Sequence, residues 1–142
     1  MSVQAKRRAD YQPPAFSIAT VDLHITLHPT QTKVISTLSV TRNGAHDSPL
    51  VLDGDNLSLD SISINGTHLS DNEYTLTDSA LSVVTELDEF VLEITNTIAP
   101  EHNKALEGLY LSGGAYCTQC EAEGFRRITY FMYRPDVLSV YT

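Results

Sequence analysis

The most reactive side chains of this sequence lie between residues 117 and 123, where two cysteines are followed by two glutamates. Cys117 and Cys120 have the C-x-x-C spacing of a redox dithiol or of one half of a zinc site. No strand–helix–strand pattern of the kind that carries a thioredoxin-like dithiol surrounds them. A structural zinc site needs four ligands, and although His102 could supply a third, nothing indicates a fourth. Two free thiols are therefore the simplest interpretation, with a small dithiol protein as an alternative.

Glu121 and Glu123 are two residues apart, so an extended backbone would place both carboxylates on one face. Paired carboxylates can exchange protons with a substrate or hold a cation. Solvated carboxylates in a loop are more common, and the spacing alone does not distinguish these roles.

His24 and His28 are four residues apart, a spacing that would place them on one face of a helix. The alternation around them predicts a strand instead, in which four residues span about 13 Å. One zinc ion needs each ligand at about 2.1 Å. We therefore expect no metal site at these two histidines.

The first hundred residues, which must position these groups, have the pattern of antiparallel strands. Apolar residues alternate with polar ones at 21–27 and again at 34–40, with Pro29 in the turn between them. This alternation predicts a long hairpin with one buried face. Asn65-Gly66 is the strongest hairpin signal, because a type I′ turn needs positive φ at both central residues.

Further short apolar segments follow at 50–52, 57–64, 74–76, 81–84 and 90–94. The alternation slips by one near Ser61, which predicts a bulge. Short strands at such regular spacing predict a mainly β fold, an antiparallel β-sandwich, and we expect residues 1–142 to form a single β domain. Beyond Pro100 the sequence is irregular, and Arg134-Pro135-Asp136 predicts a short helical turn through Leu138.

The charge distribution disfavours two classes of partner. The 142 residues carry 18 acidic and 9 basic side chains, a formal net charge of −9. Residues 43–103 include twelve acidic side chains and no Lys or Arg. Surfaces that bind nucleic acid or anionic membranes need clustered Lys and Arg, so we expect neither partner. The acidic stretch is most simply a solvated surface, although a free-standing acidic β-sandwich that binds a cationic partner is an alternative.

The N-terminal basic run Lys6-Arg7-Arg8 is followed by Ala9-Asp10 and not by the apolar region of a signal peptide. No segment approaches the roughly 18 consecutive apolar residues of a membrane-spanning helix. Together with the small number of cysteines, these features predict a cytoplasmic protein.

The most distinctive part of the sequence extends from residue 106 to residue 138. It contains L-E-G-L-Y at 106–110, C-T-Q-C-E-A-E-G-F-R at 117–126, R-I-T-Y-F at 127–131 and R-P-D-V-L at 134–138. These motifs resemble the bacterial branch of the aminopeptidase N family, which are zinc metallo-aminopeptidases of the gluzincin type. Asp10-Tyr11 and Pro14 fit the same pattern near the start, so the resemblance covers essentially the whole chain.

The resemblance implies a saddle-shaped, mostly β N-terminal domain of a larger enzyme that removes N-terminal residues from peptides. In the family this domain docks against a thermolysin-like catalytic domain, which would be a partner within the same polypeptide. The resemblance implies that the glutamate of the T-Q-x-E segment, here Glu121, would bind the α-amino group of the peptide substrate. It also implies that Gln119 would line the pocket for the first side chain, and it implies no role for Glu123.

The catalytic and metal-binding motifs of the family are absent from the chain. None of the five histidines begins a His-Glu-x-x-His motif, and no Gly-x-Met-Glu-Asn segment is present. The resemblance therefore implies that zinc is held by the parent enzyme with ligands outside this chain, and that the chain alone has no catalytic residue, cofactor or activity. The last residues, 137–141, are still largely apolar, which suggests a cut within a longer polypeptide.

Overall fold

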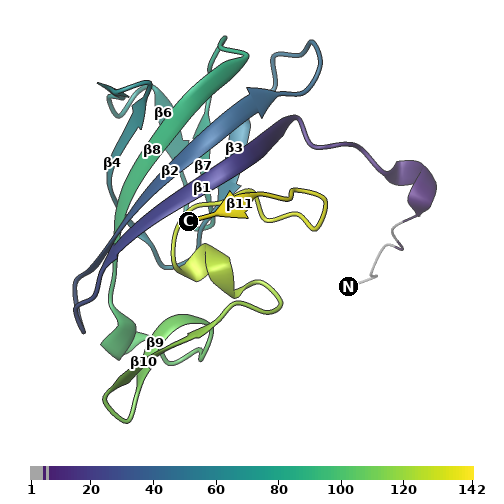
Figure 1. Cartoon of the computed structure of the whole chain (residues 1–142). Helices are drawn as coiled ribbons and strands as arrows, with labels where there is room; N and C mark the ends of the chain where they lie inside the picture. The colour runs from purple at the N-terminus through teal and green to yellow at the C-terminus, as the bar shows by residue number, and fades with distance from the viewer. Residues whose placement is uncertain (1–4, 6) are drawn as a thin grey trace.

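A twisted six-stranded sheet forms the main body of the molecule (Figure 1). The computed structural model describes residue 5 and residues 7–142. Residues 1–4 and Lys6 lie outside the described residues. They belong to the predicted domain, and Lys6 belongs to the basic N-terminal run. Neighbouring strands of this sheet are antiparallel, except that β11 runs parallel to β1. In spatial order the strands are β11 (Val140–Tyr141), β1 (Phe16–Thr26), β2 (Thr32–Arg42), β8 (Glu89–Ile98), β4 (Ser58–Ile64) and β5 (Thr67–His68).

The three local features predicted for this sheet are confirmed. β1 and β2 form the long antiparallel hairpin, and β2 alternates buried and less buried residues along its length. The β4–β8 register shifts between Leu59 and Ser61, which is the predicted bulge. Asn65 and Gly66 connect β4 to β5 with φ values of 50° and 83°, as a type I′ turn requires.

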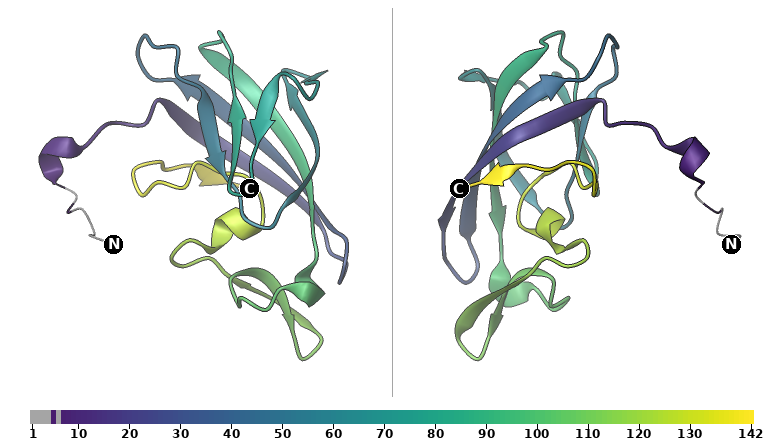
Figure 2. Two further views of the ribbon diagram at one scale, coloured as in Figure 1. Left: turned by 180° about the vertical axis from the view of Figure 1, so that it is seen from behind. Right: turned by 45° about the vertical axis from the view of Figure 1, so that its right-hand side comes forward.

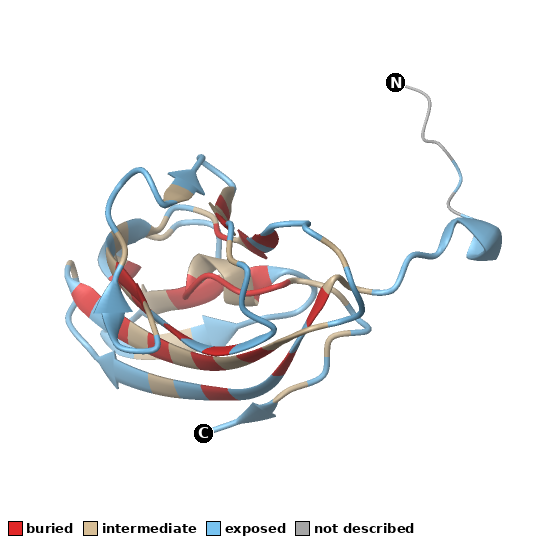
Figure 3. Ribbon diagram, turned by 90° about the horizontal axis from the view of Figure 1, so that it is seen from above, coloured by how far each residue is buried: buried red, intermediate tan, exposed pale blue. Residues whose placement is uncertain are grey.

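A second, three-stranded sheet packs against the first and completes the sandwich (Figures 2 and 3). Its strands, in spatial order, are β3 (Leu50–Asp53), β7 (Ala80–Val83) and β6 (Tyr74–Leu76). The apolar faces of both sheets enclose one core, because each strand turns alternate side chains inward. The central members of this core are fully or almost fully buried: Ile18, Val21, Leu38, Leu50, Leu52, Leu81, Val83, Leu92 and Ile94.

Residues 100–127 extend from one end of the sandwich, and the chain then returns to its core and to β11. This extension contains the 3₁₀ turn η2 (Pro100–His102), the hairpin of β9 (Gly108–Ser112) and β10 (Ala115–Gln119), and the 3₁₀ turn η3 (Gly124–Arg127). In Figure 1 the hairpin lies below the sandwich, and η3 lies between the two. None of the helices in the described part of the chain is both long enough and apolar enough to span a bilayer.

The predicted helical turn at 134–138 is wrong in its extent. The Val137 N–H donates to the Arg134 carbonyl at 3.1 Å, but the turn does not continue as a helix. The Asp136 carboxylate is instead held by Arg134 and by the Tyr11 hydroxyl, at 2.7 Å and 2.9 Å. Tyr11 follows the short 3₁₀ turn η1 (Arg8–Asp10), so this contact ties the projecting N-terminal arm to the C-terminal segment.

Candidate functional site

The hairpin of β9 and β10 carries the first of the two predicted site residues. Gly113 and Gly114 form its tip with φ values of 57° and 83°, a conformation that glycine adopts without strain. The strands pair in register from Ala115 opposite Ser112 to Gln119 opposite Gly108. Gln119 therefore lies at the end of the hairpin nearest the sandwich, immediately before the turn that carries Glu121.

Gly124 closes that turn and allows it to pack tightly. Its N–H donates to the Cys120 carbonyl at 2.8 Å. A Cβ atom at Gly124 would overlap the Gln119 carbonyl oxygen and would lie 3.0 Å from the Gly108 nitrogen. Because both contacts are with backbone atoms, no side-chain rotation could relieve them, and the turn requires glycine here.

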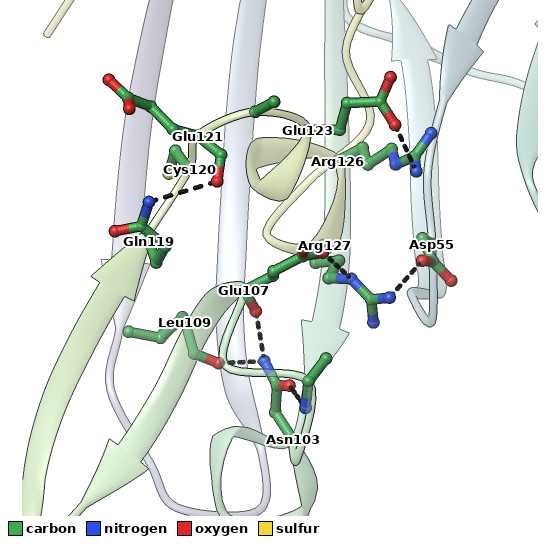
Figure 4. Close-up of polar contacts among 12 residues, drawn as sticks. Asp55, Asn103, Glu107, Leu109, Gln119, Cys120, Glu121, Glu123, Arg126 and Arg127 are labelled. Atoms are coloured by element: carbon green, nitrogen blue, oxygen red, sulfur yellow. Dashed lines mark hydrogen bonds and ion pairs between the residues drawn. The ribbon is translucent and has the colours of Figure 1, made fainter.

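The Glu121 side chain is exposed, and its carboxylate points away from the protein in Figure 4. Within the described part of the chain the carboxylate makes no hydrogen bond or ion pair. Gln119 lies beside it, and its side-chain Nε2 donates to the Glu121 backbone carbonyl at 3.2 Å. This bond occupies the amide nitrogen of Gln119 and leaves its Oε1 available to an incoming group.

Glu123 has a different environment. Its carboxylate accepts from the Arg126 guanidinium at 2.8 Å, within one turn of η3 (Figure 4). Residues 121–123 form a turn with a cis peptide bond between Glu121 and Ala122. Because residues 121–123 form a turn, the extended backbone that would have placed both carboxylates on one face is not present, and the Glu123 carboxylate is paired with Arg126.

Arg127 joins the hairpin to the sandwich through two carboxylates. Its guanidinium lies 3.0 Å from Asp55, in the loop after β3, and 3.3 Å from Glu107, directly before β9. The Asn103 side-chain amide donates to the backbone carbonyls of Glu107 at 2.7 Å and Leu109 at 2.9 Å, which fixes the start of β9 (Figure 4). These groups hold the base of the hairpin.

Tyr133 provides a second connection. Its backbone N–H donates to the Asp53 carboxylate at 3.1 Å, and its hydroxyl lies 3.2 Å from the Cys120 carbonyl and also donates to the carbonyl of Ala122. Desolvation by burial raises the pKa of Tyr133, with a smaller contribution from Glu123. The phenol therefore keeps its proton at neutral pH and acts as a donor to the turn.

A groove of about 1130 Å³ adjoins the same turn. Cys120, Ala122 and Glu123 contribute to its wall, but neither Gln119 nor Glu121 does. Five aromatic side chains line it: Tyr11, Phe125, Phe131, Tyr133 and Tyr141. The groove is thus a largely aromatic surface with charged residues at its wall, directly beside the turn that carries Glu121.

The two cysteines do not lie in the backbone setting of a thioredoxin-like dithiol. Cys117 is half-buried and Cys120 exposed, and both thiols are free. Desolvation raises the pKa of the Cys120 thiol. Cys117 lies on β10 and Cys120 directly after it, and residues 108–127, all of which the structure describes, contain a hairpin and a 3₁₀ turn but not the strand-to-helix turn that carries a thioredoxin-like dithiol. The structure therefore disfavours the dithiol alternative.

No group of three or more His, Cys, Asp or Glu side chains that could hold a metal ion occurs among the described residues. His28 has a local structural role instead. Its Nδ1 accepts the backbone N–H groups of Thr30 and Gln31, each at 3.2 Å, and so orders the turn between β1 and β2.

Known proteins resemble this chain in sequence and in structure. No family model matches the chain. The chain is 52% identical to a protein named aminopeptidase N from Caulobacter vibrioides over 139 residues, which are 98% of this chain and 16% of that protein. The chain is homologous to bacterial aminopeptidase N. It spans about one sixth of the length of the curated relatives it matches.

Solved structures agree with the aminopeptidase N homology. The crystal structure of Legionella pneumophila aminopeptidase A in complex with aspartic acid matches with a TM-score of 0.85 and 34% identity, over 96% of this chain and 16% of that chain. An M1 zinc metallopeptidase from Deinococcus radiodurans, bound to a Tyr-Ser-Ala substrate, matches with a TM-score of 0.72 over 89% of this chain and 31% of that chain. At 19% identity, this second match supports the fold alone. The fold is that of the N-terminal domain of M1 aminopeptidases, which confirms the predicted fold class.

Gln119 and Glu121 could be predicted as site residues, but the residues that hold them in place could not. Arg127 and Asn103 act on the base of the hairpin, and Tyr133 acts on the turn. Their partners are distant in sequence or are backbone atoms. The one local signal was glycine: Gly108 and Gly124 mark the positions where backbone segments approach each other closely.

Proposed function

We propose that this chain is the N-terminal domain of a zinc-dependent aminopeptidase and that it anchors the N-terminus of the peptide substrate. The observation that carries the proposal is the free carboxylate of Glu121 beside Gln119, in a chain 52% identical to aminopeptidase N. The remainder of a longer polypeptide, the catalytic domain, would dock beside this site and supply the chemistry.

Glu121 would bind the α-amino group of the substrate. A carboxylate and an ammonium form a charge-assisted hydrogen bond about twice as strong as a neutral one. The carboxylate has no competing cation in the described part of the chain, unlike Glu123, which is paired with Arg126. Holding the amino group at a fixed point places the first peptide bond at a fixed distance from it, so that one residue would be removed in each cycle.

Gln119 would line the pocket for the first side chain of the substrate. Because its amide nitrogen donates to the Glu121 carbonyl, its orientation is linked to the same turn. The free Oε1 would then face the substrate as a hydrogen-bond acceptor.

The described residues do not provide a set of zinc ligands. We therefore propose that the zinc ligands and the catalytic groups lie in the part of the polypeptide outside this chain, and we assign no chemical step to the 142 residues. The isolated chain should bind no stoichiometric zinc and should not hydrolyse aminoacyl substrates. We retain the cytoplasm as the predicted location.

The anchoring role is tested by comparing Glu121→Gln with Glu123→Gln in the longer polypeptide. Both variants remove one negative charge from the same turn and keep the size of the side chain, and Glu123→Gln also removes the ion pair with Arg126. We expect Glu121→Gln to lower kcat/KM for an aminoacyl chromogenic substrate at least ten-fold, because a hydrogen bond to a charged group contributes about 1.5–3 kcal/mol. Glu123→Gln should stay within about two-fold. Full activity of Glu121→Gln, or equal losses in both variants, would refute the proposal.

A further inference from the structure

The hydroxyl of Tyr133 contacts the turn on both sides of Glu121. It lies 3.2 Å from the carbonyl of Cys120, the residue before Glu121, and it also donates to the carbonyl of Ala122, the residue after it. A phenol carries one proton, which these two carbonyls share. The backbone on either side of the Glu121 Cα is therefore held from a single point.

Tyr133 is itself fixed to the sandwich. Its N–H donates to the carboxylate of Asp53, at the end of strand β3. The backbone of Asp53 exchanges two hydrogen bonds with Phe131, at 2.8 Å and 3.1 Å, and Phe131 is part of the buried core. A continuous chain of hydrogen bonds thus leads from the core, through Asp53 and Tyr133, to the turn.

The other hydrogen bonds to the carbonyls of the turn are local. The Gly124 N–H and the Gln119 side chain donate to the carbonyls of Cys120 and Glu121 from within the same six-residue segment. Such bonds shape the turn but do not orient it relative to the sandwich. Within the described part of the chain, Tyr133 is the donor to these carbonyls that comes from outside residues 119–124.

We propose that Tyr133 is a positioning residue, which orients the Glu121 carboxylate toward the substrate amino group through its hydroxyl. The proposal rests on the proposed function of Glu121. Without the hydroxyl, the carbonyls of this exposed turn would be hydrated, so the domain would remain folded while the carboxylate sampled additional orientations. The cost would then fall on substrate binding and alignment, and not on stability.

A double-mutant cycle between Tyr133→Phe and Glu121→Gln in the longer polypeptide tests this directly. We expect Tyr133→Phe to lower kcat/KM for an aminoacyl chromogenic substrate by about three- to ten-fold, the range expected for one hydrogen bond. In the Glu121→Gln background the same substitution should change kcat/KM by less than about two-fold, because Tyr133 acts through the carboxylate. A merely structural role would give equal losses in both backgrounds.

Tyr74→Phe is the matched control. Tyr74 lies on strand β6, in a part of the molecule that does not contact the turn, and its hydroxyl donates to the Asp71 carboxylate at 3.1 Å. The substitution removes this hydroxyl. Its kcat/KM should stay within about two-fold of the wild type. A melting curve of each variant establishes that it is folded at the assay temperature.

A second variant keeps the test decisive if Tyr133→Phe does not fold. Asp53→Ala releases the backbone of Tyr133, and Asp53→Asn retains an acceptor oxygen there. We expect Asp53→Ala, but not Asp53→Asn, to reproduce the loss and its dependence on Glu121. Unchanged kcat/KM in Tyr133→Phe, or additive losses with Glu121→Gln, would overturn the positioning role. Unchanged kcat/KM in Glu121→Gln would instead overturn the anchoring function itself.

Discussion

A buried hydrogen bond between Asn96 and Thr129 ties the segment after η3 to the centre of the main sheet. The Thr129 hydroxyl donates to Asn96 Oδ1 at 2.8 Å, and Asn96 Nδ2 donates to the Ile128 carbonyl at 2.9 Å. Both side chains are completely buried, with 0% exposure. Thr129→Val keeps the shape of the side chain but leaves the Asn96 oxygen buried without its donor.

The expected cost follows from this burial. An unsatisfied buried polar group costs about 1–3 kcal/mol, so we expect Thr129→Val to lower the free energy of unfolding by about 2 kcal/mol. In a domain of this size that change corresponds to a fall in Tm of roughly 6–8 °C. Urea unfolding of the 142-residue chain, followed by circular dichroism, measures the difference, and the slope m should not change.

Thr97→Val is the matched control, because Thr97 is the next residue of the same strand. Its hydroxyl donates to Asp60 at 2.6 Å, but at the exposed surface, where water replaces the lost partner. We expect a change within about 0.5 kcal/mol. If Thr129→Val also fell within that limit, or if both variants lost the same stability, the inference that burial makes this hydrogen bond important would be refuted.

Two further predictions concern the turn and the N-terminal arm. Gly124→Ala should lower the free energy of unfolding by about 3 kcal/mol, because its Cβ would overlap the Gln119 backbone. Gly113→Ala is the control: its Cβ would meet open space at φ +57°, so it should cost only about 1 kcal/mol in the same urea unfolding assay. Equal costs of the two substitutions would contradict the steric argument. The hydrogen bonds from Arg134, followed by the smaller effect of Tyr11, lower the pKa of Asp136 from 3.8 to about 2. Because the pKa of Asp136 is lower in the folded than in the unfolded state, its ionised carboxylate contributes stability that is complete above about pH 4 and is lost as the pH falls toward 2. An NMR titration of the Asp136 carboxyl with a midpoint near 4 would contradict this prediction.

The sandwich could be predicted from the sequence because its strands are amphipathic and its turns use residues with distinctive backbone preferences. The alternation at 21–27 and 34–40 became the β1–β2 hairpin, and Asn65-Gly66 became the β4–β5 turn. The alternation of apolar and polar residues is a local pattern, so it can be recognised in a single sequence. The break in the alternation near Ser61 likewise predicted the register shift between β4 and β8.

The candidate site could be predicted only in part. Glu121 and Gln119 were named from a resemblance, since nothing in their spacing separates them from other loop residues. The turn at 121–123 was not apparent, because extended and turned backbones can carry the same C-E-A-E letters. The hydrogen bonds of Tyr133 and the ion pairs of Arg127 join segments that are far apart in sequence or involve backbone carbonyls, and neither leaves a periodic pattern.

The hairpin and turn are attached to the smaller sheet at the end of β3, in addition to the buried hydrogen bonds of Asn96 that tie the segment after η3 to the main sheet. The ion pair of Arg127 with Asp55 holds the base of the hairpin, and the hydrogen bond of Tyr133 to Asp53 holds the turn. The Asp55 N–H also donates to the Arg126 carbonyl at 2.9 Å, so several separate contacts fix the orientation of the hairpin relative to the sandwich. Asp53 and Asp55 both belong to the end of β3 and the loop that follows it, so this edge of the smaller sheet contributes to the orientation of the turn that carries Glu121. If Glu121 binds the substrate ammonium as we propose, it would need such support, because a displacement of about 1 Å can cost two orders of magnitude in rate.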